Sequence, residues 1–341
     1  MRIAIVEMIC GIILTGIIPP FLILFDKNKE QENGNKAERE HGTEQEDSVM
    51  GKILFSVTVF FVIASILMQQ NANLLFGTIL GSSLFQLLVL NGISRITSER
   101  KYLFTDNYQG GKYLIFVVVL LLFLSADYLL TGKTNNNIIS RTDGIILIAV
   151  YLVFHFSMHK SRKENLKYER KENKENGKSK EFAKNRRNAE NRADEYFSKR
   201  RRRGIINAII LLVIAAGAYL LTASIGRLAI EISQSQYFMG VLFGGITVNI
   251  SSGILLSIER TESTKYSKQT VENVLLVNTF LMGYTVLVRE IRVRQYMIYA
   301  FILFALASIL MEGLKKIDNR LAGSGMVTVY IGIIVYIILH H

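Results

Sequence analysis

The sequence predicts an all-α membrane protein of about ten transmembrane helices, arranged as two inverted repeats of five helices each. Three observations lead to this fold class. The 341 residues contain ten apolar stretches, half of all residues are hydrophobic, and one long basic segment separates the first five stretches from the last five. Each stretch is close to the roughly 20 residues that a helix needs to cross about 30 Å of hydrocarbon. A helix also satisfies its own backbone hydrogen bonds, which lipid cannot do.

The apolar stretches set the order of the predicted helices. Along the chain they are Ile3–Phe25, Val49–Met68, Asn73–Ile96, Tyr113–Leu130, Ile138–Met158, Gly204–Ala229, Tyr237–Ile258, Val271–Val288, Tyr296–Met311 and Leu321–Ile338. The chain is therefore predicted to divide into a first five-helix repeat over residues 1–158, a basic loop over 159–203 and a second five-helix repeat over 204–341. An acidic loop, residues 26–48, follows the first predicted helix.

The charges of the loops predict the orientation of the chain. The basic loop carries 18 Lys and Arg residues against eight Asp and Glu residues. Because positive loops stay in the cytoplasm, this loop is predicted to be cytoplasmic, and five crossings on each side of it place both termini outside the cell membrane. The loop with Arg289, Arg292 and Arg294 is an exception to this charge pattern. The run at 199–203 is expected to contact anionic lipid headgroups.

Composition narrows the classes of function. A net charge of +12 would suggest nucleic acid for a soluble protein, but most of the excess lies in one loop, so no nucleic-acid partner is expected. Cys10 is the single cysteine, which excludes an internal disulfide and a cysteine-based metal centre. Because no Ser/His/Asp or Cys/His set falls on a soluble surface, neither an enzyme nor a cofactor is expected. The expected partners are the lipid bilayer and small inorganic cations, and the sequence leaves the oligomeric state open.

The two halves resemble each other. Arg-x-x-Gly opens the last helix of each half, at Arg141 and at Arg320, and Gly-x-x-x-Gly occurs at 77–81 and at 240–244. Small residues one helical turn apart let helices approach closely. Because five crossings is an odd number, the second half must enter the bilayer from the opposite side to the first. Repeats of opposite orientation are typical of transporters, with the binding site near the midplane where the repeats meet.

Three segments resemble the sodium/calcium exchanger superfamily. Residues 75–92 are similar to the third helix of that superfamily, where the pattern is Gly-Asn-x-x-Gly-Ser-Asn-x-Phe-Asn-x-Leu-Leu-x-Leu-Gly. The matching residues are Gly77, Gly81, Ser82, Phe85, Leu87, Leu88 and Leu90. Residues 271–281 resemble the second copy of the pattern and keep Asn273, Asn278 and Phe280. Residues 139–147 resemble the fifth helix, which commonly opens with Ser-Arg-x-Glu-Gly.

The resemblance implies a ten-helix antiporter that exchanges calcium for sodium or protons. In the family, carboxylates and hydroxyls on the second, third, seventh and eighth helices hold the ions, and the second and seventh helices carry Gly-Thr-Ser-x-Pro-Glu. This sequence departs from that signature. Asn249 stands at the acidic position of the seventh helix, Val59 at that of the second, and Ser83 replaces an asparagine of the third. Both signature carboxylates are missing.

The remaining polar residues predict an uncharged ion site. The candidate residues of the ion pathway are Ser56, Thr58, Ser82, Ser83, Thr247, Asn249, Asn273 and Asn278. Ca²⁺ takes six to eight oxygen ligands and depends on their charge, so neutral oxygens favour a monovalent cation such as Na⁺ or K⁺ over Ca²⁺. These residues are expected to surround a water-accessible polar cavity at the midplane. The alternative is that each one only forms a hydrogen bond between helices.

Two acidic residues offer another source of charge, Glu7 in the first stretch and Asp127 in the fourth. Either could serve the ion pathway or extend to the headgroups. The predicted function is a secondary cation antiporter that transports cations such as Na⁺, Ca²⁺, K⁺ or H⁺. The alternative is a transport-inactive relative that acts as a membrane scaffold or regulator.

Overall fold

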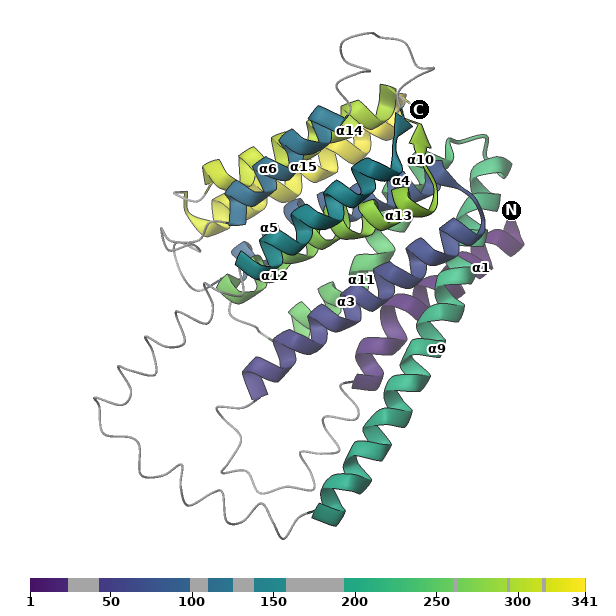
Figure 1. The fold of residues 1–341 in the computed structure, drawn as a ribbon, viewed down its shortest axis with the longest axis vertical. Coiled ribbons are helices and arrows are strands. Elements are labelled where there is room, and N and C mark those ends of the chain that lie inside the picture. The colour runs from purple at the N-terminus through teal and green to yellow at the C-terminus, as the bar shows by residue number, and fades with distance from the viewer. Residues whose placement is uncertain are drawn as a thin grey trace, which may run out of the picture.

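The computed structural model describes residues 1–23, 43–98, 110–124, 138–157, 193–259, 263–292, 295–314 and 317–340. Within these ranges the chain is almost entirely helical (Figure 1). Asp127 and most of the two predicted loops, 26–48 and 159–203, lie outside the described residues.

Helices occupy all five predicted stretches of the first half. They are α1 (Arg2–Ile12) with the π-helical η1 (Ile13–Ile17) and a helical extension to residue 23, α3 (Thr43–Met68), the continuous helix formed by α4 (Ala72–Leu84), η3 (Phe85–Leu90) and α5 (Asn91–Ile96), α6 (Gly110–Leu124), and a helix over residues 141–157.

The described residues of the second half are also helical. Its helices are α9 (Ala193–Glu231), the continuous helix formed by α10 (Gln236–Met239), η6 (Gly240–Gly244) and α11 (Gly245–Glu259), the continuous helix formed by α12 (Ser263–Leu275), η7 (Leu276–Leu281) and α13 (Met282–Val288), then α14 (Gln295–Gly313) and α15 (Asn319–His340). Within the described residues, five helices are long and apolar enough to cross a membrane: Arg2–Ile23, Ala72–Ile96, Ile205–Glu231, Gln236–Ile254 and Gln269–Val288.

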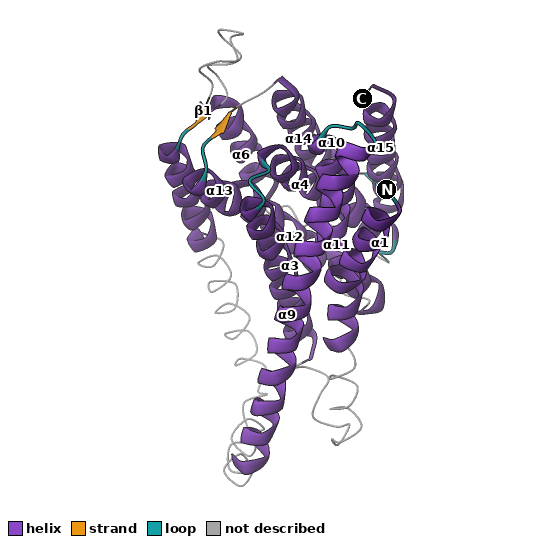
Figure 2. Cartoon of the chain, turned by 90° about the vertical axis from the view of Figure 1, so that its right-hand side faces the viewer, coloured by secondary structure: helices purple, strands orange, loops and turns teal. Residues whose placement is uncertain are grey.

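One end of the bundle gathers termini and turns from both halves. The amino group of Met1 pairs with Glu231 at the end of α9. Strand β1 (Ile138–Ile139) pairs antiparallel with β2 (Ile291–Arg292), which follows α13 (Figure 2). The Arg289 side chain donates a hydrogen bond of 2.7 Å to the carbonyl of Gln70, in the turn between α3 and α4. It follows that α1 is antiparallel to α9, and that α4 is antiparallel to α13.

Glycines let the central helices pack backbone to backbone. A Cβ on Gly77 would lie within 3.0 Å of the backbone of Tyr237, and one on Gly240 within 3.0 Å of that of Leu74. The helix that contains α4 and the helix that contains η6 therefore touch without side chains between them. This is the close approach that the two Gly-x-x-x-Gly segments predict.

Candidate ion site

The candidate site lies where α3, α4, α11 and the helix containing η7 pack together in the interior of the bundle. The side chains of Ser82, Ser83, Asn249 and Asn278 are buried there. Ser82 and Ser83 both lie on α4. Hydrogen bonds join them to Asn249 on α11 and to Asn278 on η7.

Asn249 connects α11 to α4. Its Nδ2 atom donates to the Oγ of Ser82 at 3.0 Å, to the carbonyl of Ser82 at 3.3 Å and to the carbonyl of Gly245 at 2.7 Å. A backbone carbonyl only accepts, so these contacts fix which end of the amide is nitrogen. The Oδ1 atom of Asn249 therefore points the other way, where it accepts a 2.7 Å bond from Nε2 of Gln86.

Asn278 connects η7 to α4 in a similar manner. Its Nδ2 atom donates to the Oγ of Ser83 at 2.6 Å and to the carbonyl of Val274 at 2.9 Å. The carbonyl again fixes the orientation of the amide. Ser83 in turn donates to the carbonyl of Ile79 at 2.9 Å.

Several buried oxygen atoms on these helices have no hydrogen-bond partner in the described part of the chain. The Oε1 atom of Gln86, the Oδ1 atom of Asn278 and the Oγ1 atom of Thr58 have no hydrogen-bond partner within the described residues, although each side chain is almost completely buried. Leaving a buried acceptor unpaired costs about 1–3 kcal/mol. Neutral oxygens of this kind are suited to coordinate a cation.

Gln86 is absent from the residues that the sequence predicts for the site. It follows Phe85, at the position where the exchanger pattern has its last asparagine, so the motif itself contains the signal. Its link to Asn249 joins residues 163 positions apart in the chain. Such a pairing can be recognised only in the three-dimensional structure.

The other predicted residues take less part in these contacts. Thr247 donates to the carbonyl of Phe243 on its own helix at 2.6 Å. Asn273 is buried on α12, five residues before Asn278 and therefore about 7.5 Å away along the axis. Ser56 is half-buried on α3. The described contacts do not bring Thr247 and Asn273 into the network around Ser82 and Ser83.

The site is built from neutral groups. Among the described residues, Arg95 is the only charged side chain that is buried, and its guanidinium donates to the carbonyl of Leu314 at one end of the bundle. Glu7 is 26% exposed and pairs at 2.8 Å with Arg227, so it links α1 to α9 rather than joining the amides. The described part of the chain has no group of three or more His, Cys, Asp and Glu residues placed to hold a metal.

Glu272 is the acidic residue on the same helix as Asn278. It is half-buried and close enough to Tyr151 to act on that phenol electrostatically. Six residues separate it from Asn278, which places the two side chains about 9 Å apart along the axis and on different faces. Glu272 therefore lies near the helix over residues 141–157 and on a different face from Asn278.

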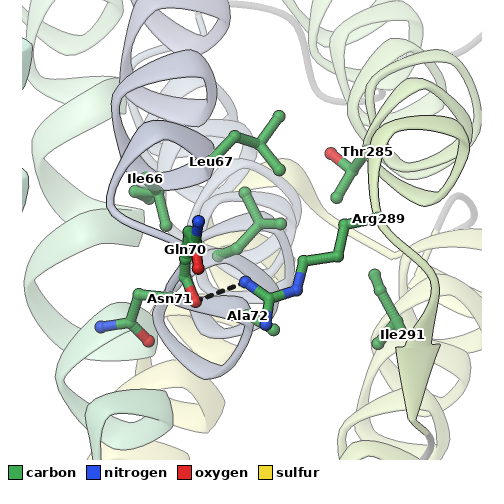
Figure 3. A pocket seen from close by; sticks show the side chains of 9 residues that line it. Ile66, Leu67, Gln70, Asn71, Ala72, Thr285, Arg289 and Ile291 are labelled. Carbon is green, nitrogen blue, oxygen red and sulfur yellow. Dashed lines mark hydrogen bonds between the residues drawn. The ribbon is translucent and has the colours of Figure 1, made fainter.

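The open polar cavity expected at the midplane stays a prediction. The amides and hydroxyls contact one another directly there. A small pocket, partly open to solvent, lies at the end of the bundle where Arg289 crosses to the α3–α4 turn (Figure 3). Its lining residues are Ile66, Leu67, Gln70, Asn71, Ala72, Leu75, Thr285, Arg289 and Ile291.

Three π-helical segments accompany the site. Gln86 lies in η3, Asn278 lies in η7, and η6 ends five residues before Asn249. A π turn inserts extra backbone into a helix and is common at functional sites. The π turns and the buried polar side chains therefore indicate the same part of the bundle as the candidate site.

Comparisons with known proteins point to sodium/calcium exchangers. Residues 48–158 match the family described as sodium/calcium exchanger protein. The resemblance seen in the sequence is confirmed, and the chain is a multi-pass helical membrane protein. Among curated protein sequences, none matches this chain with significance.

Solved exchanger structures have the same fold as the whole chain. Native YfkE is 14% identical, with a TM-score of 0.58 over 85% of this chain and 83% of YfkE. A second structure, described as the Ca²⁺/H⁺ antiporter YfkE, gives a TM-score of 0.57 at 13% identity over 99% of this chain and 100% of that chain. The sodium-calcium exchanger NCX_Mj soaked with Na⁺ and Sr²⁺ gives 0.57 at 15% identity over 97% of each chain.

Proposed function

We propose that this chain is a secondary-active cation antiporter, with its ion site at the interface of two inverted repeats, and that it is selective for monovalent cations. The observation that carries the proposal is the buried, uncharged set of oxygens around Gln86 and Asn278. A scaffold would have no reason to keep unpaired oxygens in its core. The likeness to exchanger structures supports the proposal that these oxygens serve ion transport.

The packing of α1 against α9 supports the inverted repeat. A Cβ on Gly11 would meet Leu221, and a Cβ on Gly217 would meet Thr15. Gly217 follows Gly11 by 206 residues and Leu221 follows Thr15 by 206 residues, so each contact maps onto the other when the halves are exchanged. Reciprocal contacts of this kind are expected across a two-fold axis. The antiparallel directions of α1 and α9 agree with an axis in the membrane plane.

The neutral ligands support monovalent selectivity. The cost of removing an ion from water rises with the square of its charge, and anionic ligands normally offset it for a divalent ion. In this site, amide and hydroxyl oxygens alone would have to offset the cost of removing the ion from water. They suit Na⁺ or K⁺ better than Ca²⁺. We propose the orientation predicted by the basic loop, with residues 159–203 in the cytoplasm and both termini outside.

The test is cation flux into proteoliposomes that contain the same cation inside. We expect uptake of Na⁺ or K⁺ to exceed that of Ca²⁺, and Asn278→Leu and Asn249→Leu to abolish it. Thr285→Val is the matched control, because Thr285 is also buried on the eighth helix but donates only to Leu281 on that helix. Uptake that persists in both asparagine variants would remove the site. No flux of any cation would favour the transport-inactive scaffold.

A further inference from the structure

The amide cluster bears on how tightly ion movement is coupled. An antiporter exchanges ions strictly only if its empty site cannot switch its exposure from one side of the membrane to the other. Carboxylates enforce this rule, because an unpaired carboxylate is strongly disfavoured in the protein interior. A cation must neutralise it before the site can pass through a closed state.

The site in this chain has a different composition. Asn249 donates to Ser82 and accepts from Gln86, and Asn278 donates to Ser83. These bonds connect protein groups to one another across the helices. What stays unpaired is a small number of neutral oxygens, not a charge.

We propose that this site also changes its exposure without a bound cation, so that the protein carries monovalent cations in one direction, down their electrochemical gradient, with no cation returning. The inference rests on the proposed function and deepens it. Each cycle moves one positive charge on the cation and none on the protein side chains. The flux is therefore driven by the membrane potential.

Charged residues elsewhere in the described chain are poorly placed to restore strict coupling. Glu272 faces Tyr151 on another helix. Glu7 is already paired with Arg227. Arg95 is bound to the carbonyl of Leu314 at the end of α14.

The test compares two sets of proteoliposomes, one filled with Na⁺ and one filled with N-methylglucamine, which is too large to act as a counter-ion. External sodium is supplied either as gluconate or as thiocyanate, and the permeant thiocyanate sets an inside-negative potential. With thiocyanate outside to compensate the charge, we expect Na⁺ uptake into the N-methylglucamine vesicles within about threefold of that into Na⁺-filled vesicles, since only neutral groups return. The potential should raise accumulation about tenfold for each roughly 60 mV.

Replacing an amide by its carboxylate analogue should restore strict coupling. We expect Gln86→Glu to lower uptake into N-methylglucamine vesicles more than about tenfold relative to the Na⁺-for-Na⁺ exchange of the same variant, because the charge now returns unpaired. Gln69→Glu is the matched control, because Gln69 bonds Thr222 at the end of α3, away from the cluster. Asn278→Asp provides a second variant if the first does not fold, as judged by a single peak in size-exclusion chromatography.

The outcomes separate the two proposals. Uptake that requires internal Na⁺ overturns this inference and leaves antiport in place. Uptake that ignores thiocyanate and raises the internal pH also overturns it, because protons are then the returning ion. Absence of flux in both sets of vesicles overturns the proposed function together with the inference.

Discussion

Replacing Asn278 by leucine should make the fold more stable while it abolishes transport. The substitution removes the hydrogen bond from Nδ2 to Ser83 Oγ, which spans two helices. Such bonds contribute about 0.6 kcal/mol on average in membrane proteins. The substitution also removes the unpaired Oδ1 atom, whose burial costs about 1–3 kcal/mol. The balance is a gain of roughly 0.5–2 kcal/mol, reduced by any strain from the branched side chain.

Thermal unfolding in detergent, followed by size-exclusion chromatography, measures this balance. One kcal/mol corresponds to about 2–4 °C in Tm for chains of 150–250 residues, so a rise of a few degrees is expected. Thr285→Val serves as the reference. It also removes a buried polar group on this helix, but the hydroxyl that it removes is hydrogen-bonded to the carbonyl of Leu281. If Tm falls in Asn278→Leu and not in the reference, the oxygen is structurally satisfied and the reasoning is refuted.

Two further predictions concern packing and orientation. Gly240→Leu should lower Tm by more than 5 °C or abolish folding, since a side chain there would meet the backbone of α4. Gly332→Leu, where nothing lies within 4 Å, should leave Tm unchanged in the same assay, and an equal loss in both would contradict the packing. In a cysteine-free background, Ser233→Cys should react with an impermeant maleimide from outside and Ile317→Cys only after permeabilisation. The reverse pattern would invert the proposed topology.

Helix positions were largely predictable, because the length of an apolar stretch is a local property of the sequence. Within the described residues, each predicted stretch overlaps a helix, although the fifth stretch begins with the short strand Ile138–Ile139. Boundaries were less predictable where charge and helix formation coincide. Helix α9 begins at Ala193, whereas its apolar stretch begins at Gly204, since lysine and arginine favour helices as well as water. Hydropathy cannot locate such a start.

The site was only partly predictable, for reasons that its contacts explain. Motif resemblance identified both asparagines that bridge helices, Asn249 and Asn278, because they occupy conspicuous positions in otherwise apolar stretches. It did not identify Gln86, whose role depends on a partner 163 residues away. It also could not show which polar groups contact one another directly. Contact between helices that are far apart in the sequence is a property of the packed structure.

The distinction between a structural polar residue and a functional one rests on what each side chain leaves unpaired. Thr247, Thr279 and Thr285 each donate to a carbonyl on their own helix. A hydroxyl that does this has met its donor requirement within one helix, so it needs no further explanation. Gln86 and Asn278 differ, because each uses its amide nitrogen to reach another helix and leaves an oxygen buried without a donor. A fold selected for stability alone would exchange such oxygens for apolar groups of similar size. Their position at the junction of four helices supports the proposed cation site.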